Sequence, residues 1–358
     1  MLKWGLVAHP HIGKKLAGKY ELVALAGEGG MAEVFKAVTH GAAGFRRHIA
    51  IKRLLEHLSE DPEFVAMFVE EARVTAALQH PNIVQIHDFD RDEDGVYFLV
   101  MEWVEGLNML AWLDAYRRRD EKPPWHLVTA VGIEVLKALS AAHENVDERG
   151  RKVPVFHRDV TPQNILMSAN GIVRLADFGL ARAMDRARMT RPQMVKGKLS
   201  YLAPELTTGA DPTVQTDLFG VGIVLWEALA GRKLFEGDSP LEILTKVKAC
   251  EVPPLADVRP TMPRSLEDAV LRALHPDPSR RFKSARSMVR TLANILRMTP
   301  ESTSAEVLAK SVRVARDTLG QARPIGAGTE TLDLDALEEV DSAEASGDEP
   351  LALTRRKS

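Results

Sequence analysis

The stretch HRDVTPQN at residues 157–164, followed by DFG at residues 177–179, decides how this chain folds. It places a carboxylate, Asp159, and a carboxamide, Asn164, on one predicted loop, and Asp177 adds a second carboxylate further on. Oxygens of these groups are ligands that Mg²⁺ prefers, and a carboxylate can accept the proton of an attacking hydroxyl group. Each short motif is common by chance, but the two in this order and spacing are specific.

A glycine-rich stretch, GEGGMAEV at residues 27–34, lies between two predicted strands, residues 20–25 and 34–38. Glycines allow backbone amides to approach phosphate oxygens closely. A third strand begins at residue 49 and carries Lys52, whose ammonium needs an anionic partner inside a partly closed site. Glu71, on a helix predicted to begin at residues 61–62, is the expected partner. Glu70 is the alternative, but it points about 100° away around the helix.

With these motifs in this order, the chain resembles the eukaryotic-type (Hanks-type) protein kinases, and most of all the serine/threonine kinases of bacteria, over residues 20–297. The resemblance implies an α+β, bilobal, protein-kinase-like fold. Its β-rich N-lobe would span residues 20–104 and its α-helical C-lobe residues 105–297. Residues 1–19 would form an N-terminal extension, and residues 298–358 a C-terminal helix and a largely disordered acidic tail.

The resemblance also implies transfer of the ATP γ-phosphate to protein hydroxyl groups in bacterial signalling, with ATP and Mg²⁺ as cofactors. Asp159, Lys52 and Glu71 would be catalytic, and Asn164 and Asp177 would bind the metal. Met101 would be the gatekeeper beside the adenine. The residues that would contact the nucleotide are Ala26, Gly27, Glu28, Gly29, Gly30, Met31, Ala32, Glu33, Val34, Lys52, Glu102 and Val104.

One departure from the family pattern concerns two loops that meet at the active site. The family usually has Lys two residues after the catalytic Asp, and Thr after the glycine that precedes the Ala-Pro-Glu motif. This chain has Thr161 and Lys198 at these positions. One hypothesis is that the Lys198 ammonium supplies the missing charge while the Thr161 hydroxyl helps to hold Asp159. The alternative is an impaired enzyme in which Lys198 is a solvated base.

Further motifs predict architecture and control. The resemblance predicts that Glu205, in Ala-Pro-Glu, pairs with Arg281, with Arg280 as the rival, and that Asp217 braces the catalytic loop. Thr190 is the expected autophosphorylation site, because a phosphate there would lie among many bases. These bases are Arg182, Arg186, Arg188, Arg191, Lys196 and Lys198.

Composition excludes several classes of protein. A formal net charge of -3 argues against a nucleic-acid binder. No stretch reaches the ~18 uninterrupted apolar residues of a membrane span. The only cysteine, Cys250, excludes an internal disulfide and suits a reducing compartment. We therefore expect a cytoplasmic protein whose partners are ATP and protein substrates, with self-association for autophosphorylation.

The C-terminal part changes in character. Residues 303–319 can form an amphipathic helix with Val307, Leu308, Val312 and Ala315 on one side. Residues 330–349 then contain nine acids and no base, which predicts disorder. This tail either aids solubility or docks on the basic loop around Thr190. The insertion at residues 145–154 suggests no function.

Two other functions fit parts of the pattern. A pseudokinase scaffold would bind nucleotide without turnover, and only Thr161 favours it. A small-molecule phosphotransferase of related fold is disfavoured by the Ala-Pro-Glu segment and the long loop before it, which position protein substrates.

Overall fold

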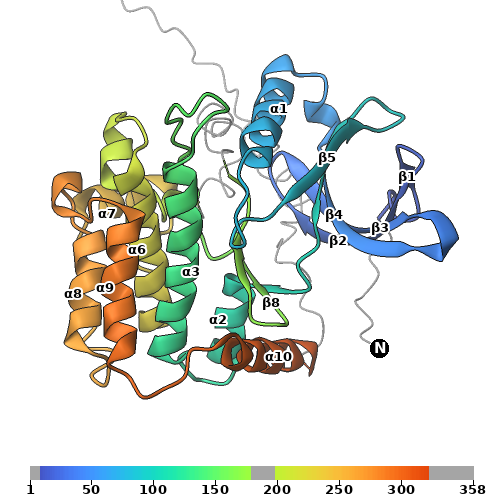
Figure 1. Cartoon of the computed structure of the whole chain (residues 1–358). Helices are drawn as coiled ribbons and strands as arrows, with labels where there is room; N and C mark the ends of the chain where they lie inside the picture. Colours follow the sequence, from blue (N-terminus) through green and yellow to red (C-terminus); the bar gives the residue numbers. More distant parts are fainter. Residues whose placement is uncertain (1–8, 179–197, 322–358) are drawn as a thin grey trace, which may run out of the picture. The chain divides into compact units, whose positions relative to one another are not determined.

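The computed structural model describes residues 9–178 and 198–321, which are coloured in Figure 1. A six-stranded antiparallel sheet in the order β1-β2-β3-β4-β6-β5 forms most of the N-lobe. Its strands are β1 (Lys15–Leu16), β2 (Tyr20–Glu28), β3 (Ala32–His40), β4 (Arg46–Leu54), β5 (Ile86–Arg91) and β6 (Tyr97–Glu102). The predicted strands of this lobe are therefore present, and the α+β, two-lobed fold class is confirmed.

Two details of the N-lobe differ from the prediction. The run from Ile83 to Phe89 predicts one strand, but β5 begins at Ile86, because Ile83 forms a bridge with Leu175 and the amide of Val84 donates to the carbonyl of Leu175. The predicted extension also takes part in the lobe: β1 pairs with β2, and the rings of His9 and Phe35 lie 5.1 Å apart.

Helix α1 (Pro62–Ala76) begins where its sequence predicts. The side chain of Asp61 accepts a hydrogen bond from the amide of Glu63, and Pro62 occupies the first turn, where the missing amide costs nothing. The helical spacing of the apolar residues from Phe64 to Leu78 predicts that Leu78 belongs to this helix, but it lies just beyond the end of α1 and is buried.

A small sheet that was not predicted lies in the C-lobe, beside its junction with the N-lobe. It consists of β7 (Gly106–Asn108), β8 (Ile165–Ser168) and β9 (Val173–Leu175), in that order. Strands of three or four residues are too short for alternation of apolar residues to identify them. Together with the bridge from Ile83 to Leu175, this sheet brings the catalytic loop and the residue-177 loop to the same place.

The C-lobe is helical. The amphipathic pattern of residues 218–230 predicts a helix from Leu218, but α6 begins four residues earlier, because Thr213 and Thr216 form a capping box at its start. The helices are α2 (Met109–Arg118), α3 (Trp125–His143), α6 (Val214–Ala230), α7 (Pro240–Ala249), α8 (Arg264–Ala273), α9 (Ala285–Arg297) and α10 (Ala305–Gln321). Short 3-10 turns occur at Ala42–Gly44, Glu56–Leu58, Pro204–Thr208 and Pro278–Arg280.

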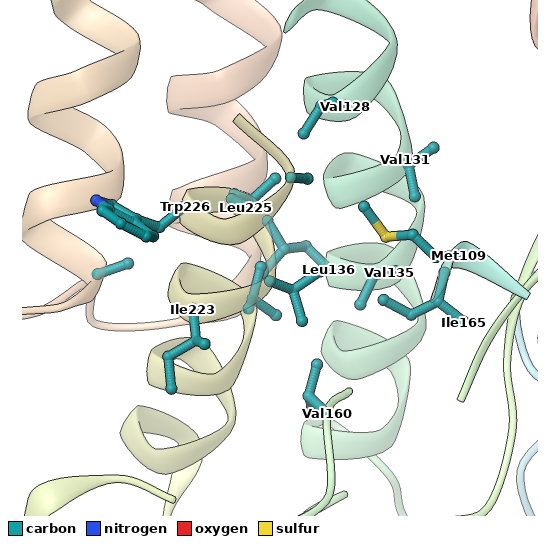
Figure 2. Packing of buried hydrophobic residues seen from close by; sticks show 14 of the residues in the cluster. Met109, Val128, Val131, Val135, Leu136, Val160, Ile165, Ile223, Leu225 and Trp226 are labelled. Carbon is teal, nitrogen blue, oxygen red and sulfur yellow. The ribbon is translucent and has the colours of Figure 1, made fainter. Parts of the chain in front are cut away.

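Helices α3 and α6 form the centre of the C-lobe, and Figure 2 shows their interleaved side chains, among them Val128, Leu136 and Leu225. The two helices approach closely at Gly132, where an added Cβ would lie 2.7 Å from Leu225. Helix α3 is the one described helix long and apolar enough to cross a membrane, but its apolar side chains belong to this core.

Helix α10 confirms the predicted C-terminal helix and lies alongside α2 (Figure 1). Leu308, Val312 and Ala315 are buried against the C-lobe, and Trp112 Nε1 donates to Ser311 Oγ over 2.9 Å. The insertion at residues 145–154 forms a tight turn in which the amide of Asp147 donates to the carbonyl of Arg151. The acidic tail lies outside the described residues.

Candidate active site

Lys52 joins both lobes at one point. Strand β4 carries this side chain, and its Nζ lies 2.8 Å from Glu71 Oε1 on α1 and 2.8 Å from Asp177 Oδ1 in the C-lobe. Glu70 instead faces solvent and pairs with Arg73. The prediction of Glu71 over Glu70 as the partner of Lys52 is therefore confirmed.

Burial and charge shift the pKa values of this cluster. Burial raises the pKa of Glu71 to about 7 against the opposing charge of Lys52, and Glu71 Oε2 is buried with no hydrogen-bond partner among the residues that the structure describes. Burial also disfavours the charges of Lys52 and Asp177, but their mutual attraction outweighs it. The pKa of Lys52 is therefore raised and that of Asp177 lowered. The pair is charged at neutral pH.

Asp217, on α6, holds the backbone of the catalytic loop. Its carboxylate accepts hydrogen bonds from the amides of His157, over 2.9 Å, and Arg158, over 2.8 Å. Arg158 has a φ of 67°, a left-handed conformation that a non-glycine residue adopts at a cost of about 1–3 kcal/mol. The buried Asp217 compensates for this strain, and its predicted role as a brace is confirmed.

Asp159 is buried, and among the described residues its carboxylate contacts two side chains. Lys198 Nζ lies 2.8 Å from Asp159 Oδ2, and Asn164 Nδ2 donates to the same oxygen over 3.2 Å and to the Asp159 carbonyl over 2.8 Å. Thr161 is buried, but within the described ranges its hydroxyl makes no hydrogen bond to Asp159. The expectation that Thr161 holds Asp159 is therefore wrong: Asn164 and Lys198 hold this carboxylate instead, both at Oδ2.

The glycine-rich loop connects β2 and β3, and the amide of Gly29 donates to the carbonyl of Ala32. The protein itself has no evident need for glycine at position 27: its φ is not positive, and an added Cβ would meet nothing within 4 Å. Glycine here leaves room for something other than protein to approach the backbone. Val34, at the end of the loop, is paired in register with Lys52.

The segment after β6 leaves backbone groups available. The amide of Glu102 donates to the carbonyl of Gln85, and the Glu102 side chain pairs with Arg174 over 3.0 Å. In the part of the chain that the structure describes, neither the amide nor the carbonyl of Val104 has a hydrogen-bond partner. Val104 thus offers one donor and one acceptor for a ligand.

The predicted ion pair of the C-lobe is also present: Arg281 contacts Glu205 over 2.8 Å, and Arg280 does not.

Several predicted residues cannot be placed, because Gly179, Thr190 and the bases from Arg182 to Lys196 lie outside the described residues. Sequence reasoning did not identify His143, whose Nε2 lies 2.7 Å from Asp217 Oδ2, or the Arg174–Glu102 pair. Neither His143 nor Arg174 stands in a motif, and Glu102 was expected only at the nucleotide, so nothing in the sequence indicated these contacts.

Comparison with known proteins agrees with this geometry. Residues 20–292 match the family described as protein kinase domain. The chain is 38% identical over 279 residues to tyrosine-protein kinase MasK of Myxococcus xanthus, covering 78% of this chain and 43% of that protein. It is 35% identical over 279 residues to serine/threonine-protein kinase PrkC of Bacillus subtilis, covering 77% and 40%. The chain thus spans about two fifths of the length of these relatives.

Comparison with solved structures also finds a protein kinase domain. The crystal structure of the Mycobacterium tuberculosis PknI kinase domain matches with a TM-score of 0.58 and 28% sequence identity, and the match covers 79% of this chain and 98% of that one.

Proposed function

Because this chain belongs to the protein kinase family, we propose that it transfers the γ-phosphate of ATP to serine and threonine hydroxyl groups of proteins, in bacterial signalling. We propose residues 20–297 as the kinase domain, with the N-lobe ending at residue 104. The observation that carries the proposal is the Lys52–Glu71 and Lys52–Asp177 pairing beside Asp159 and Asn164. These are the parts that phosphoryl transfer requires.

The residues present fit ATP and Mg²⁺. Asn164 and Asp177 offer hard oxygen ligands, and within residues 9–178 and 198–321 no group of three or more His, Cys, Asp or Glu side chains could enclose a metal alone. Such a site suits Mg²⁺, which takes one or two protein ligands together with substrate phosphates and neutralises their charge when bound. In the described part of the chain, the open space at Gly27 suits the phosphates, and the backbone groups of Val104, which have no partner there, suit the adenine.

Each catalytic side chain has a distinct task. Lys52, oriented by Glu71, would bind the α- and β-phosphates, since a buried ammonium held by a carboxylate keeps one geometry. Asp159 would orient the substrate hydroxyl and accept its proton. The backbone around Asp159 is braced by Asp217, which limits the reorganisation needed on binding.

The class of hydroxyl group is the finer part of the proposal. Relatives named serine/threonine kinases support it, but MasK, which is also similar, carries the name of a tyrosine kinase. The catalytic loop of this chain reads Thr161-Pro162-Gln163 and lacks the Ala-Ala-Arg sequence that is typical of this loop in tyrosine kinases. We therefore propose serine/threonine specificity.

We also propose that the protein autophosphorylates at Thr190 through self-association, and that its kinase domain works in the cytoplasm, where ATP is supplied. The bases flanking Thr190 could gather around a phosphate. Peptide mass spectrometry after incubation with Mg-ATP tests the site: phosphate at Thr190 supports it, and its absence from fully active protein contradicts it.

The function itself is tested with the full chain, γ-labelled Mg-ATP and a generic protein substrate, followed by phosphoamino-acid analysis. We expect phosphoserine and phosphothreonine, and none with Asp159→Ala. Phosphotyrosine alone would contradict the specificity. No transfer, with ATP still raising the melting temperature, would contradict the activity and indicate a scaffold.

A further inference from the structure

The positions of a lysine and a threonine are exchanged in this active site. The family pattern places Lys two residues after the catalytic Asp and Thr in the segment before Ala-Pro-Glu. This chain has Thr161 in the first position and Lys198 in the second. The two positions are far apart in sequence, but both adjoin Asp159 or the loop that carries it.

The structure shows where the ammonium of Lys198 lies. Its Nζ is 2.8 Å from Asp159 Oδ2. The Lys198 side chain is 33% exposed, and the Asp159 side chain is 10% exposed. Asn164 Nδ2 reaches the same oxygen over 3.2 Å. A cation therefore touches the candidate base from the residue-198 segment and not from position 161.

The backbone that carries Lys198 is anchored. The Lys198 carbonyl accepts a hydrogen bond from the amide of Tyr201, and Leu199, Ser200 and Tyr201 are all buried. The Tyr201 hydroxyl donates to Glu227 Oε2 over 2.6 Å, which fastens the segment to α6. Lys198 thus extends from a fixed point toward Asp159, as a group that acts on a bound substrate must.

We propose that Lys198 is a catalytic residue that supplies, from the second loop, the positive charge that Thr161 cannot supply from the first. This inference rests on the proposed kinase activity and deepens it. The substrate hydroxyl oxygen forms a bond to the γ-phosphorus, and its proton passes to Asp159. The bond from the γ-phosphorus to the bridging oxygen breaks, and ADP leaves with the electron pair. Lys198 stabilises the negative charge on the transferred phosphoryl group.

The first test exchanges the two residues. We expect Lys198→Met, which keeps the apolar stem, to lower kcat by about 100-fold or more while the KM for ATP changes little. Lys198→Thr should be similarly slow, and the double variant Thr161→Lys/Lys198→Thr should recover most of the lost rate. Lys248→Ala, which removes an exposed lysine on α7, is the matched control and should behave as wild type. Unchanged kcat in Lys198→Met, or a double variant no faster than Lys198→Thr, would overturn the inference.

The second test does not depend on turnover. An ATP analogue with an acyl group on its γ-phosphate acylates nearby amines. The lysine nitrogen forms an amide bond to the acyl carbon, the bond from that carbon to the phosphate oxygen breaks, ATP leaves with the electron pair, and the amine proton passes to solvent. We expect peptide mass spectrometry to find label on Lys198 and Lys52, suppressed by excess ATP. In the double variant the label should move from position 198 to position 161.

The outcomes separate the inference from the function on which it rests. Label on Lys52 but not on Lys198 would overturn the role of Lys198 and leave nucleotide binding intact. Label on neither lysine would contradict both the role of Lys198 and the binding of the nucleotide. Melting temperatures near the wild-type value in all variants would show that the changes arise in the site and not from unfolding.

Discussion

Arg281 and Glu205 form a bidentate ion pair: Nη1 and Nη2 of the guanidinium donate to Oε1 and Oε2 of the carboxylate, each over 2.8 Å. The Arg281 side chain is fully buried, and it also donates to the carbonyls of Gln215, His275 and Pro276. One side chain thus connects the Ala-Pro-Glu segment with the start of α6 and the turn after α8.

We expect Arg281→Met to destabilise the protein by about 3–5 kcal/mol, because it leaves the Glu205 carboxylate partly buried without its partner. Arg280→Ala is the matched control: Arg280 is exposed and should contribute almost nothing. Urea unfolding of both variants measures the difference. Equal stabilities would contradict the role of the Arg281–Glu205 pair.

Helix α10 should contribute to the stability of the kinase domain. A chain ending at residue 304 loses the buried Leu308 and Val312 and uncovers Trp112, so we expect a loss of about 3–5 kcal/mol. A chain ending at residue 321 keeps α10 and is the control, with the stability of the full chain. The measurement is again urea unfolding, and identical midpoints for both truncations would refute the prediction.

Glu71 should make stability depend on pH. Its pKa is raised by burial from the ordinary 4.5 to about 7, so the folded protein keeps a proton that the unfolded chain has released between these values. The free energy of unfolding should therefore fall as pH rises from about 4.5 to 7, by about 3 kcal/mol, and then level off.

The control for this prediction is Glu71→Gln, which removes the titration. The wild-type free energy of unfolding, measured relative to this variant at pH 5, 6, 7 and 8, should decrease with pH. A constant difference over this range would show that Glu71 titrates at its ordinary value.

Gly27 allows binding and folding to be separated. Because an added Cβ meets no protein atom within 4 Å, Gly27→Ala should leave the melting temperature unchanged. It should weaken ATP binding by about 5-fold, equivalent to about 1 kcal/mol, because the methyl group occupies space needed by phosphates. Calorimetric titration with ATP measures this. Unaltered affinity would exclude the glycine-rich loop from the nucleotide site at this position.

Much of the fold could be predicted from local chemistry. Asp61 and Pro62 mark the start of α1, and the apolar residues Leu308, Val312 and Ala315 mark the buried side of α10. The short strands β7, β8 and β9 could not be predicted, because they are stabilised by contacts between distant segments and not by their own pattern. The same holds for α10: periodicity predicts a helix and an apolar side, but not that α2 covers it.

The contacts of the candidate active site could likewise be predicted only in part. Motif order predicted the pairing of Lys52 with Glu71 and of Glu205 with Arg281, because each motif has a fixed place in the family. The partner of Asp159 depends on how two separate loops meet, so Lys198 could be placed correctly near the site while the expected contact from Thr161 was wrong. His143 had no motif to reveal it and lies against Asp217 only through packing of α3 on α6.

The most direct test of the account is a single-turnover measurement of γ-phosphate transfer from Mg-ATP to a protein substrate, with ADP affinity measured in parallel. Wild type should transfer phosphate to serine and threonine. Asp159→Asn should bind ADP with wild-type affinity but transfer phosphate at least about 100-fold more slowly, because the proton acceptor is lost and the nucleotide contacts remain. Equal transfer rates in wild type and Asp159→Asn, or no transfer by wild type that binds ADP, would contradict the proposed active site.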